Sequence, residues 1–224
     1  MSIGVDRAGV GRAAGRVANE LERRIVTGEL LPGQPIRQEL MAEQLGVSRL
    51  PIREALRQLT AEGLVAHTPN VGYVVARLDQ DEIEQIYLMR AALEPEVLRS
   101  LPRLAGTAMR EVSDAAARVR SAAERGDLLE MRLENRTFHF AMFDRSPLQL
   151  VVSELRRLWT LAMPYHAVYL YDPEARARVL AEHDAMVDAL TDGDNDRVVA
   201  LMAQHRQGGE SGATVVLQTS RRTP

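Results

Sequence analysis

The sequence contains no cysteine, which excludes disulfide bonds and metal sites built on thiolates. Lysine is absent as well, so all 28 basic residues are arginines, a bias typical of GC-rich coding rather than of one function. No apolar run approaches the length of a membrane-spanning helix, and we expect no secretory signal before the first helix. We therefore expect a cytoplasmic protein that does not contact a membrane.

The 224 residues, 46% of them hydrophobic, are enough for two domains with cores of modest size. The formal net charge of −3 does not by itself indicate a nucleic-acid-binding protein. Residues 1–77 contain ten arginines and eight acidic residues, whereas residues 78–224 contain 18 arginines and 23 acidic residues. Any affinity for DNA must therefore come from the local placement of arginines and not from a broad positive field.

Residues 39–63 predict two short helices joined by a tight turn. Gly46 interrupts the first helix, Ser48 can cap the second through its hydroxyl, and Pro51 lies in the first turn, where a missing N–H costs nothing. The apolar residues of the second helix then follow at helical spacing: Ile52, Ala55, Leu56 and Leu59. This pattern indicates a helical hairpin with one buried face.

Arginines repeat every four residues on another face of the second helix, at Arg49, Arg53 and Arg57. A helix of this size fits the major groove of DNA, and an arginine fork can bond O6 and N7 of guanine. The alternative is a charged, solvent-facing hairpin in any helical bundle. The spacing of the arginines does not decide between the two.

Two short strands are expected directly after this hairpin, at residues 64–66 and 73–75. Pro69, Asn70 and Gly72 would form the turn between them. Two helices, a recognition helix and a β-hairpin in this order are typical of a winged helix-turn-helix. This order favours the DNA-binding interpretation.

The run LGVSRLPIREALRQLTAEGLV (residues 45–65), followed by PNVGYVV (residues 69–75), resembles the N-terminal domain of GntR-family bacterial transcription regulators. The resemblance implies binding to a double-stranded DNA operator. The residues it assigns to DNA contact are Arg37, Ser48, Arg49, Pro51, Arg53, Asn70 and Gly72. Many relatives carry a DNA-contacting arginine where this chain has Glu39, and whether Arg37 substitutes for it is open.

The predicted fold is mainly α: a winged helix-turn-helix at residues 1–77, an all-α bundle of about six helices at residues 78–210, and a tail at residues 211–224. Residues 1–10 read as a loose leader before a helix at about 12–27. Pro95 should kink or break the first bundle helix, and the sixth should end near Gly208. The bundle helices are expected to begin near Asp79, Gly106, Asp127, Ser146, Asp172 and Asp194.

Three of the five histidines lie on the apolar faces of three different predicted bundle helices, at His139, His183 and His205. Asn135 precedes His139 by four residues, so the two side chains project together. Three converging imidazoles would bind a divalent metal ion. For each histidine alone, the alternative is a core residue hydrogen-bonded to a neighbour.

The segments NRTFH (residues 135–139), AEHDAMVDAL (181–190) and LMAQH (201–205) resemble the FCD effector domain of FadR-like GntR regulators. The resemblance implies a divalent metal ion, zinc, nickel or similar, held by His139, His183 and His205. The fourth ligand position is Asn135, where the family more often has aspartate. Arg90 matches an arginine that tends to face the ligand cavity, although an exposed Arg90 paired with Glu94 is the alternative. Tyr165 and His166 are further candidates for the cavity wall.

Together these resemblances imply a homodimeric regulator that binds a palindromic operator and responds to a small organic acid. An enzyme built on the three histidines is one alternative. Against it, Glu182 and Asp184, the carboxylates beside His183, should point away from the histidines. A regulator with a purely structural metal is the other alternative.

Overall fold

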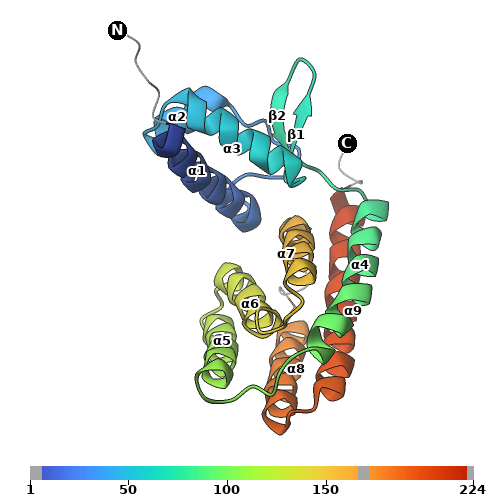
Figure 1. Ribbon diagram of the computed structural model, residues 1–224. Helices are drawn as coiled ribbons and strands as arrows, with labels where there is room; N and C mark the ends of the chain where they lie inside the picture. The colour runs from blue at the N-terminus through green and yellow to red at the C-terminus, as the bar shows by residue number, and fades with distance from the viewer. Residues whose placement is uncertain (1–6, 166–171, 221–224) are drawn as a thin grey trace. The chain divides into compact units, whose positions relative to one another are not determined.

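The computed structural model of the chain describes residues 7–165 and 172–220, with side chains over 11–165 and 172–210. The chain divides into two compact units, Met1–Leu78 and Asp79–Pro224 (Figure 1). The described residues form nine α-helices, one short 3₁₀ helix and one two-stranded sheet. The predicted class, a winged helix-turn-helix followed by an all-α bundle, is confirmed.

The first unit contains α1 (Arg7–Thr27), α2 (Gln38–Leu45) and α3 (Arg49–Ala61), and α3 packs against both other helices. The largest side chains of its core are at most 1% exposed: Leu21, Ile25, Ile52, Leu56 and Leu59. Helix α1 begins earlier than expected. Residues 7–10, which were predicted to belong to a loose leader, are already helical. Arginine and alanine in this stretch favour helix formation, and no proline interrupts it.

The tight turn and the β-hairpin depend on left-handed backbone at two glycines. Gly46 ends α2 with φ of 63°, and Gly72, with φ of 91°, begins the second strand. Strand β1 (Val65–Thr68) pairs antiparallel with β2 (Gly72–Val75). The preceding loop holds β2 from its other side, since the Ile36 amide donates to the Tyr73 carbonyl at 2.8 Å. Strand β2 is therefore held along both of its edges, by β1 on one side and by the loop on the other.

The second unit contains six α-helices among its described residues, as expected. They are α4 (Gln80–Arg99), α5 (Gly106–Glu124), α6 (Leu128–Phe143), α7 (Gln149–Ala162), α8 (Pro173–Asp192) and α9 (Asn195–Ser220), and η1 (Met163–Tyr165) follows α7. Aspartates cap four of these helices. The Asp79 carboxylate accepts from the Glu82 amide at 2.9 Å, and Asp127, Asp172 and Asp194 cap α6, α8 and α9 in the same manner.

Pro95 lies inside α4, which continues unbroken to Arg99, so the expected break does not occur. The bundle differs from the expectation at its last helix, because α9 runs through Gly208 to Ser220 and residues 211–220 are helical rather than a tail. A Cβ on Gly208 would lie 2.7 Å from Arg178 Nη2, and one on Gly209 would lie 3.4 Å from Tyr87 Oη. Side chains from two other helices thus pack close to these glycines, and neither glycine ends the helix. Residues 221–224 lie outside the described part of the chain.

The bundle surrounds one continuous apolar core. α4 packs against α7 and α9, α5 packs against α6 and α8, and α8 packs against α9 (Figure 1). Trp159 of α7 and Phe138 and Phe143 of α6 are its largest fully buried core residues. The three histidines lie on α6, α8 and α9, whose inner faces meet in this core. No helix within the described ranges is both long and apolar enough to cross a membrane.

Candidate functional site

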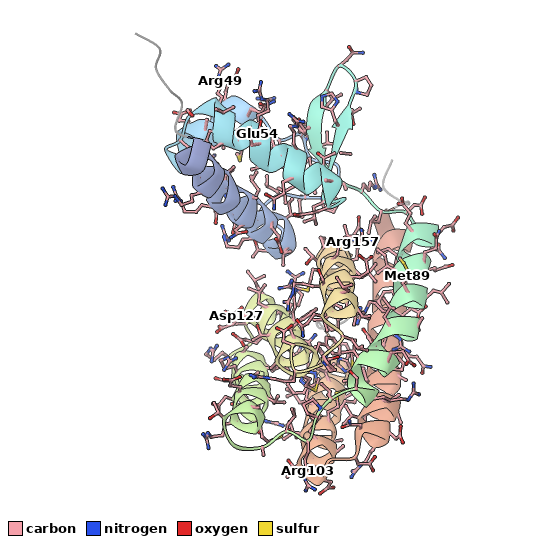
Figure 2. The ribbon with its side chains drawn as sticks, viewed as in Figure 1. Arg49, Glu54, Met89, Arg103, Asp127 and Arg157 are labelled. Carbon is pink, nitrogen blue, oxygen red and sulfur yellow. The ribbon has the colours of Figure 1, made fainter. Side chains whose placement is uncertain are left out.

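Helix α3 separates an inner apolar face from an outer charged face. Ile52 is fully buried, whereas Arg49 and Arg53 are exposed, and Figure 2 shows Arg49 projecting from the start of the helix on the side away from α1. Ser48 occupies the N-cap position, but its hydroxyl makes no capping hydrogen bond, which corrects the expected cap. Its backbone nevertheless has the extended conformation of an N-cap, with ψ of 168°. The exposed hydroxyl remains free for another acceptor or donor.

Pro51 was expected among the DNA-contacting residues, yet it is buried. It lies on the inner side of the first turn of α3, where its missing N–H leaves no unmade helix bond. Its structural contribution is therefore to begin the helix. Direct contact of its side chain with DNA would require this turn to rearrange.

One surface groove brings together residues from the loop, α2, α3 and the wing. It is lined by Arg37, Glu39, Arg49, Gly72 and Tyr73, among others. Asn70 lies at the exposed tip of the wing, with φ of 64°. Glu39 Oε1 lies 3.2 Å from Arg49 Nη1, and both side chains are 72% exposed. An ion pair this exposed contributes little to stability, so its effect is on the charge presented at the surface.

The three bundle histidines converge in the core of the second unit. One ring nitrogen of each of His139, His183 and His205 lies within 4.8 Å of one nitrogen of the other two. Their exposed fractions are 0%, 1% and 6%. The Nε2 atoms of His139 and His205 are 3.1 Å apart, and the His183 ring stacks on Phe138 with a centroid distance of 4.2 Å. Three helices thus bring their imidazoles to one enclosed point.

Buried polar atoms of the cluster, and of Asn135 one helical turn before His139, have the character of metal ligands. Asn135 is 8% exposed, and its Oδ1 atom has no hydrogen-bond partner among the described residues; the same holds for both ring nitrogens of His183. Burial, followed by the charges of His205 and Arg120, holds the pKa of His183 well below its ordinary value. A neutral imidazole is the form that binds a metal ion. Buried polar atoms without partners are costly, so these residues fit a coordinated cation.

Glu182 does not point away from the histidines, which corrects the sequence expectation. Its Oε2 atom accepts a hydrogen bond from Nδ1 of His205 at 2.7 Å, and the carboxylate is buried. Successive helical residues differ in direction by about 100°, so Glu182 can face α9 while His183 faces the core. Asp184 does lie apart, exposed and paired with Arg120 at 2.6 Å.

Arg90 is paired with Glu94, as the alternative to a cavity-facing arginine predicted, but the pair is buried rather than exposed. Arg90 is 2% exposed and Glu94 is fully buried. The Arg90 Nε atom donates to Glu94 Oε1 at 2.9 Å, and Arg206 Nη1 donates to Oε2 at 2.9 Å. Trp159 Nε1 also donates to Glu94, at 3.1 Å. The guanidinium of Arg90 lies 4.0 Å from the centroid of the Trp159 ring, whose other neighbours include His139 at 4.8 Å.

Glu182, which was expected to point away, and Arg206, which sequence reasoning missed, both belong to this polar core. Both are adjacent in sequence to a cluster histidine, but adjacency does not say which helix will pack on that side. Tyr165 is buried in η1, and His166 lies outside the described residues.

Comparison with known proteins identifies both units. Residues 13–75 match the model for bacterial regulatory proteins of the gntR family, and residues 85–208 match the model for the FCD domain. The chain belongs to the GntR family. Its order of domains, a GntR helix-turn-helix followed by an FCD domain, is that of the FadR-like branch.

Relatives of this GntR regulator support the assignment over most of its length. The HTH-type transcriptional regulator McbR of Escherichia coli is 28% identical over 159 residues, which cover 70% of this chain and 71% of McbR. The E. coli transcriptional repressor GlaR is 27% identical over 194 residues, 83% of this chain and 88% of GlaR. The structure of E. coli McbR/YncC has the same fold, with a TM-score of 0.82 at 24% identity over 94% of this chain and 99% of that one. The chain is a transcription regulator, not an enzyme.

Proposed function

We propose that this GntR regulator acts in the cytoplasm as a homodimer on a palindromic DNA operator, and that a small carboxylate-bearing metabolite modulates its binding. The metabolite would bind in the FCD unit beside a divalent metal ion. The observation that carries the proposal is the buried cluster of three histidines, with the buried Oδ1 of Asn135, unpaired among the described residues, one helical turn before His139. A core without a ligand-binding role has no need for so many buried polar atoms.

The metal would be held by His139, His183, His205 and Asn135. All four side chains are buried, and the neutral state of His183 suits it to coordination. A divalent ion bound there supplies a concentrated positive charge in a low-dielectric interior. Because all four ligands are neutral, none of that charge is cancelled by direct coordination.

Arg90 and its neighbours favour an anionic effector. The group of Arg90, Arg206 and Glu94 carries two positive charges and one negative charge, and all three side chains are at most 10% exposed. Nη1 of Arg90 has no hydrogen-bond partner among the described residues. A carboxylate can accept two parallel bonds from a guanidinium and balance the remaining charge. Trp159 contacts both Arg90 and His139, which supports a role for this arginine beside the proposed metal ion.

Operator binding would use the outer face of the first unit. Arg49 and Arg53 would enter the major groove from the start of α3, while Asn70 and Gly72 present the wing to the backbone. Arg37 would add a contact from the groove beside Arg49. Dimerisation would supply the two-fold symmetry that matches a palindrome. Two apolar residues exposed on α4 offer a surface for it: Leu88, which is 70% exposed, and Met89, which is 38% exposed (Figure 2).

Calorimetric titration of organic acids into metal-loaded and chelator-treated protein tests the effector site. The panel should include gluconate, because the gluconate operon repressor of Bacillus subtilis is a relative, 27% identical over 199 residues. We expect a carboxylate to bind more tightly to the metal-loaded protein and to change its affinity for operator DNA. Equal binding to both preparations would contradict the metal-assisted site. Metal retention with no effect of any acid on operator binding would favour a purely structural metal.

Asn135→Asp sharpens this test. An aspartate ligand would cancel one positive charge, so it should tighten metal retention and weaken the effector. We expect shifts of about 1–3 kcal/mol, the usual range of coupling between two sites. Chelator competition measures the first change and calorimetry the second. If Asn135→Asp strengthened both metal retention and effector binding, the affinity for the effector would not depend on the net charge of the metal site.

A further inference from the structure

We propose that Glu182 is a positioning residue of the metal centre. Its carboxylate would hold His205 in the tautomer with the proton on Nδ1, so that the lone pair of Nε2 faces the other histidines. It would also supply a negative charge next to a ligand set that has none. This proposal rests on the proposed metal site and names the residue that orients one of its ligands.

The geometry of the Glu182–His205 pair supports the first claim, that Glu182 fixes the tautomer of His205. Oε2 of Glu182 lies 2.7 Å from Nδ1 of His205, and both residues are buried, 7% and 6% exposed. An ionised carboxylate can only accept, so Nδ1 must be the donor. The opposite ring nitrogen, Nε2, lies 3.1 Å from Nε2 of His139. The hydrogen bond to Glu182 therefore directs the second nitrogen of His205 into the cluster.

The surrounding charges support the second claim, that Glu182 supplies a negative charge to the proposed metal site. Glu94 is occupied by Arg90, Arg206 and Trp159, and Asp184 is exposed and paired with Arg120. The second oxygen of Glu182 lies 3.6 Å from Nε of Arg178, whose side chain is 48% exposed and therefore screened by water. Glu182 thus contributes a buried negative charge that is separated from the proposed ion only by the ring of its ligand His205. A divalent ion with neutral ligands gains from such a carboxylate.

Glu182 could instead serve only to satisfy His205 in the folded core. Both roles predict some loss of stability when the carboxylate is removed, so stability cannot separate them. Metal affinity and the protonation of the His205 ring can. Partners of this kind typically change metal affinity by about 10–100-fold.

Titration of the full chain with Co²⁺, followed by visible absorption and by competition with a chelator, provides the test. We expect Glu182→Ala to lower the affinity about 10–100-fold and to alter the absorption spectrum. Glu182→Gln keeps an oxygen that can accept from Nδ1 but lacks the charge, so its loss should be smaller. Asp184→Asn is the matched control: it removes a negative charge from the same helix two residues away and should leave affinity and spectrum close to wild type.

Nitrogen NMR of the histidine rings gives a second readout. Wild type and Glu182→Gln should both show the proton of His205 on Nδ1, whereas Glu182→Ala should show a mixture of tautomers. If the alanine variant does not fold, the glutamine variant decides, since Co²⁺ affinity equal to that of Asp184→Asn would overturn the charge contribution. Wild-type affinity and spectrum in a folded Glu182→Ala protein would overturn the whole proposal. A wild-type chain that binds no Co²⁺ would instead overturn the metal site itself.

Discussion

The two units of this regulator place the arginines of their candidate sites in opposite environments. In the GntR unit, Arg49 and its partner Glu39 are each 72% exposed. In the FCD unit, Arg90 is 2% exposed, and its partner Glu94 is fully buried. An exposed arginine can be removed without disturbing the fold, whereas a buried ion pair belongs to the core. Substitutions should therefore separate binding from stability in the first unit and couple them in the second.

Of the substitutions considered, Glu94→Gln should cause the largest loss of folding stability. It would leave Arg90 and Arg206 buried without a countercharge, which costs about 3–5 kcal/mol of folding free energy. Chemical unfolding of the full chain, followed by the fluorescence of Trp159, measures the loss. Glu96→Gln, in the exposed pair with Arg99 on the same helix, should change stability by less than about 1 kcal/mol. Similar small losses in both variants would show that the buried triad is not an essential part of the core.

Replacement of both Arg49 and Arg53 by alanine tests the other side of the comparison. Each base-reading arginine should contribute about 1–3 kcal/mol to operator binding and to sequence preference. The melting temperature should not change, because both side chains lie outside the apolar core. Arg16→Ala, an exposed arginine on α1, controls for the loss of charge alone. A folded double variant with wild-type operator affinity would remove α3 from the DNA-reading surface.

Local signals in the sequence were sufficient for most of the fold. Asp79, Asp127 and Asp172 begin helices because an aspartate side chain satisfies free amide groups wherever the chain lies. Gly208 and Gly209 were misleading because neither takes the left-handed backbone that ends a helix, and the side chains packed near them, Arg178 and Tyr87, are distant in sequence. A glycine in a helix costs about 1 kcal/mol, and tertiary packing can offset that amount.

The candidate site was predictable only in part, because some of its contacts also depend on packing between residues that are distant in sequence. The apolar face of each helix must enter the core, so the convergence of His139, His183 and His205 followed from periodicity. The partners of these residues did not, because Glu182 reaches His205 only through the packing of α8 on α9. Whether Arg90 was exposed could not be read from its spacing to Glu94 either. Burial of a charge depends on the elements that cover it.

Gly72→Val should have a more local effect. Valine does not adopt the φ of 91° found here without strain, which costs about 1–3 kcal/mol at one position. The strain falls on the wing, so operator binding should weaken while the thermal unfolding of the FCD unit stays unchanged. Gel-shift titration and calorimetric melting of the same preparation measure the two effects. Equal loss in both would mean that the hairpin is needed for folding and not chiefly for DNA contact.

The smallest expected effect comes from Glu39, which faces the same groove as Arg37 and Arg49. Glu39→Gln removes an exposed ion pair, so stability should change by less than about 1 kcal/mol. Operator affinity should rise, because the substitution removes a negative charge near the phosphates and frees Arg49 for DNA. The gain should shrink as salt is raised, since ions screen exposed charges over about 10 Å at 0.1 M. Glu43→Gln, also exposed on α2, serves as the control. A loss of affinity that is specific to Glu39→Gln would reverse the argument, because it would mean that this carboxylate accepts a hydrogen bond from a base amine in the major groove.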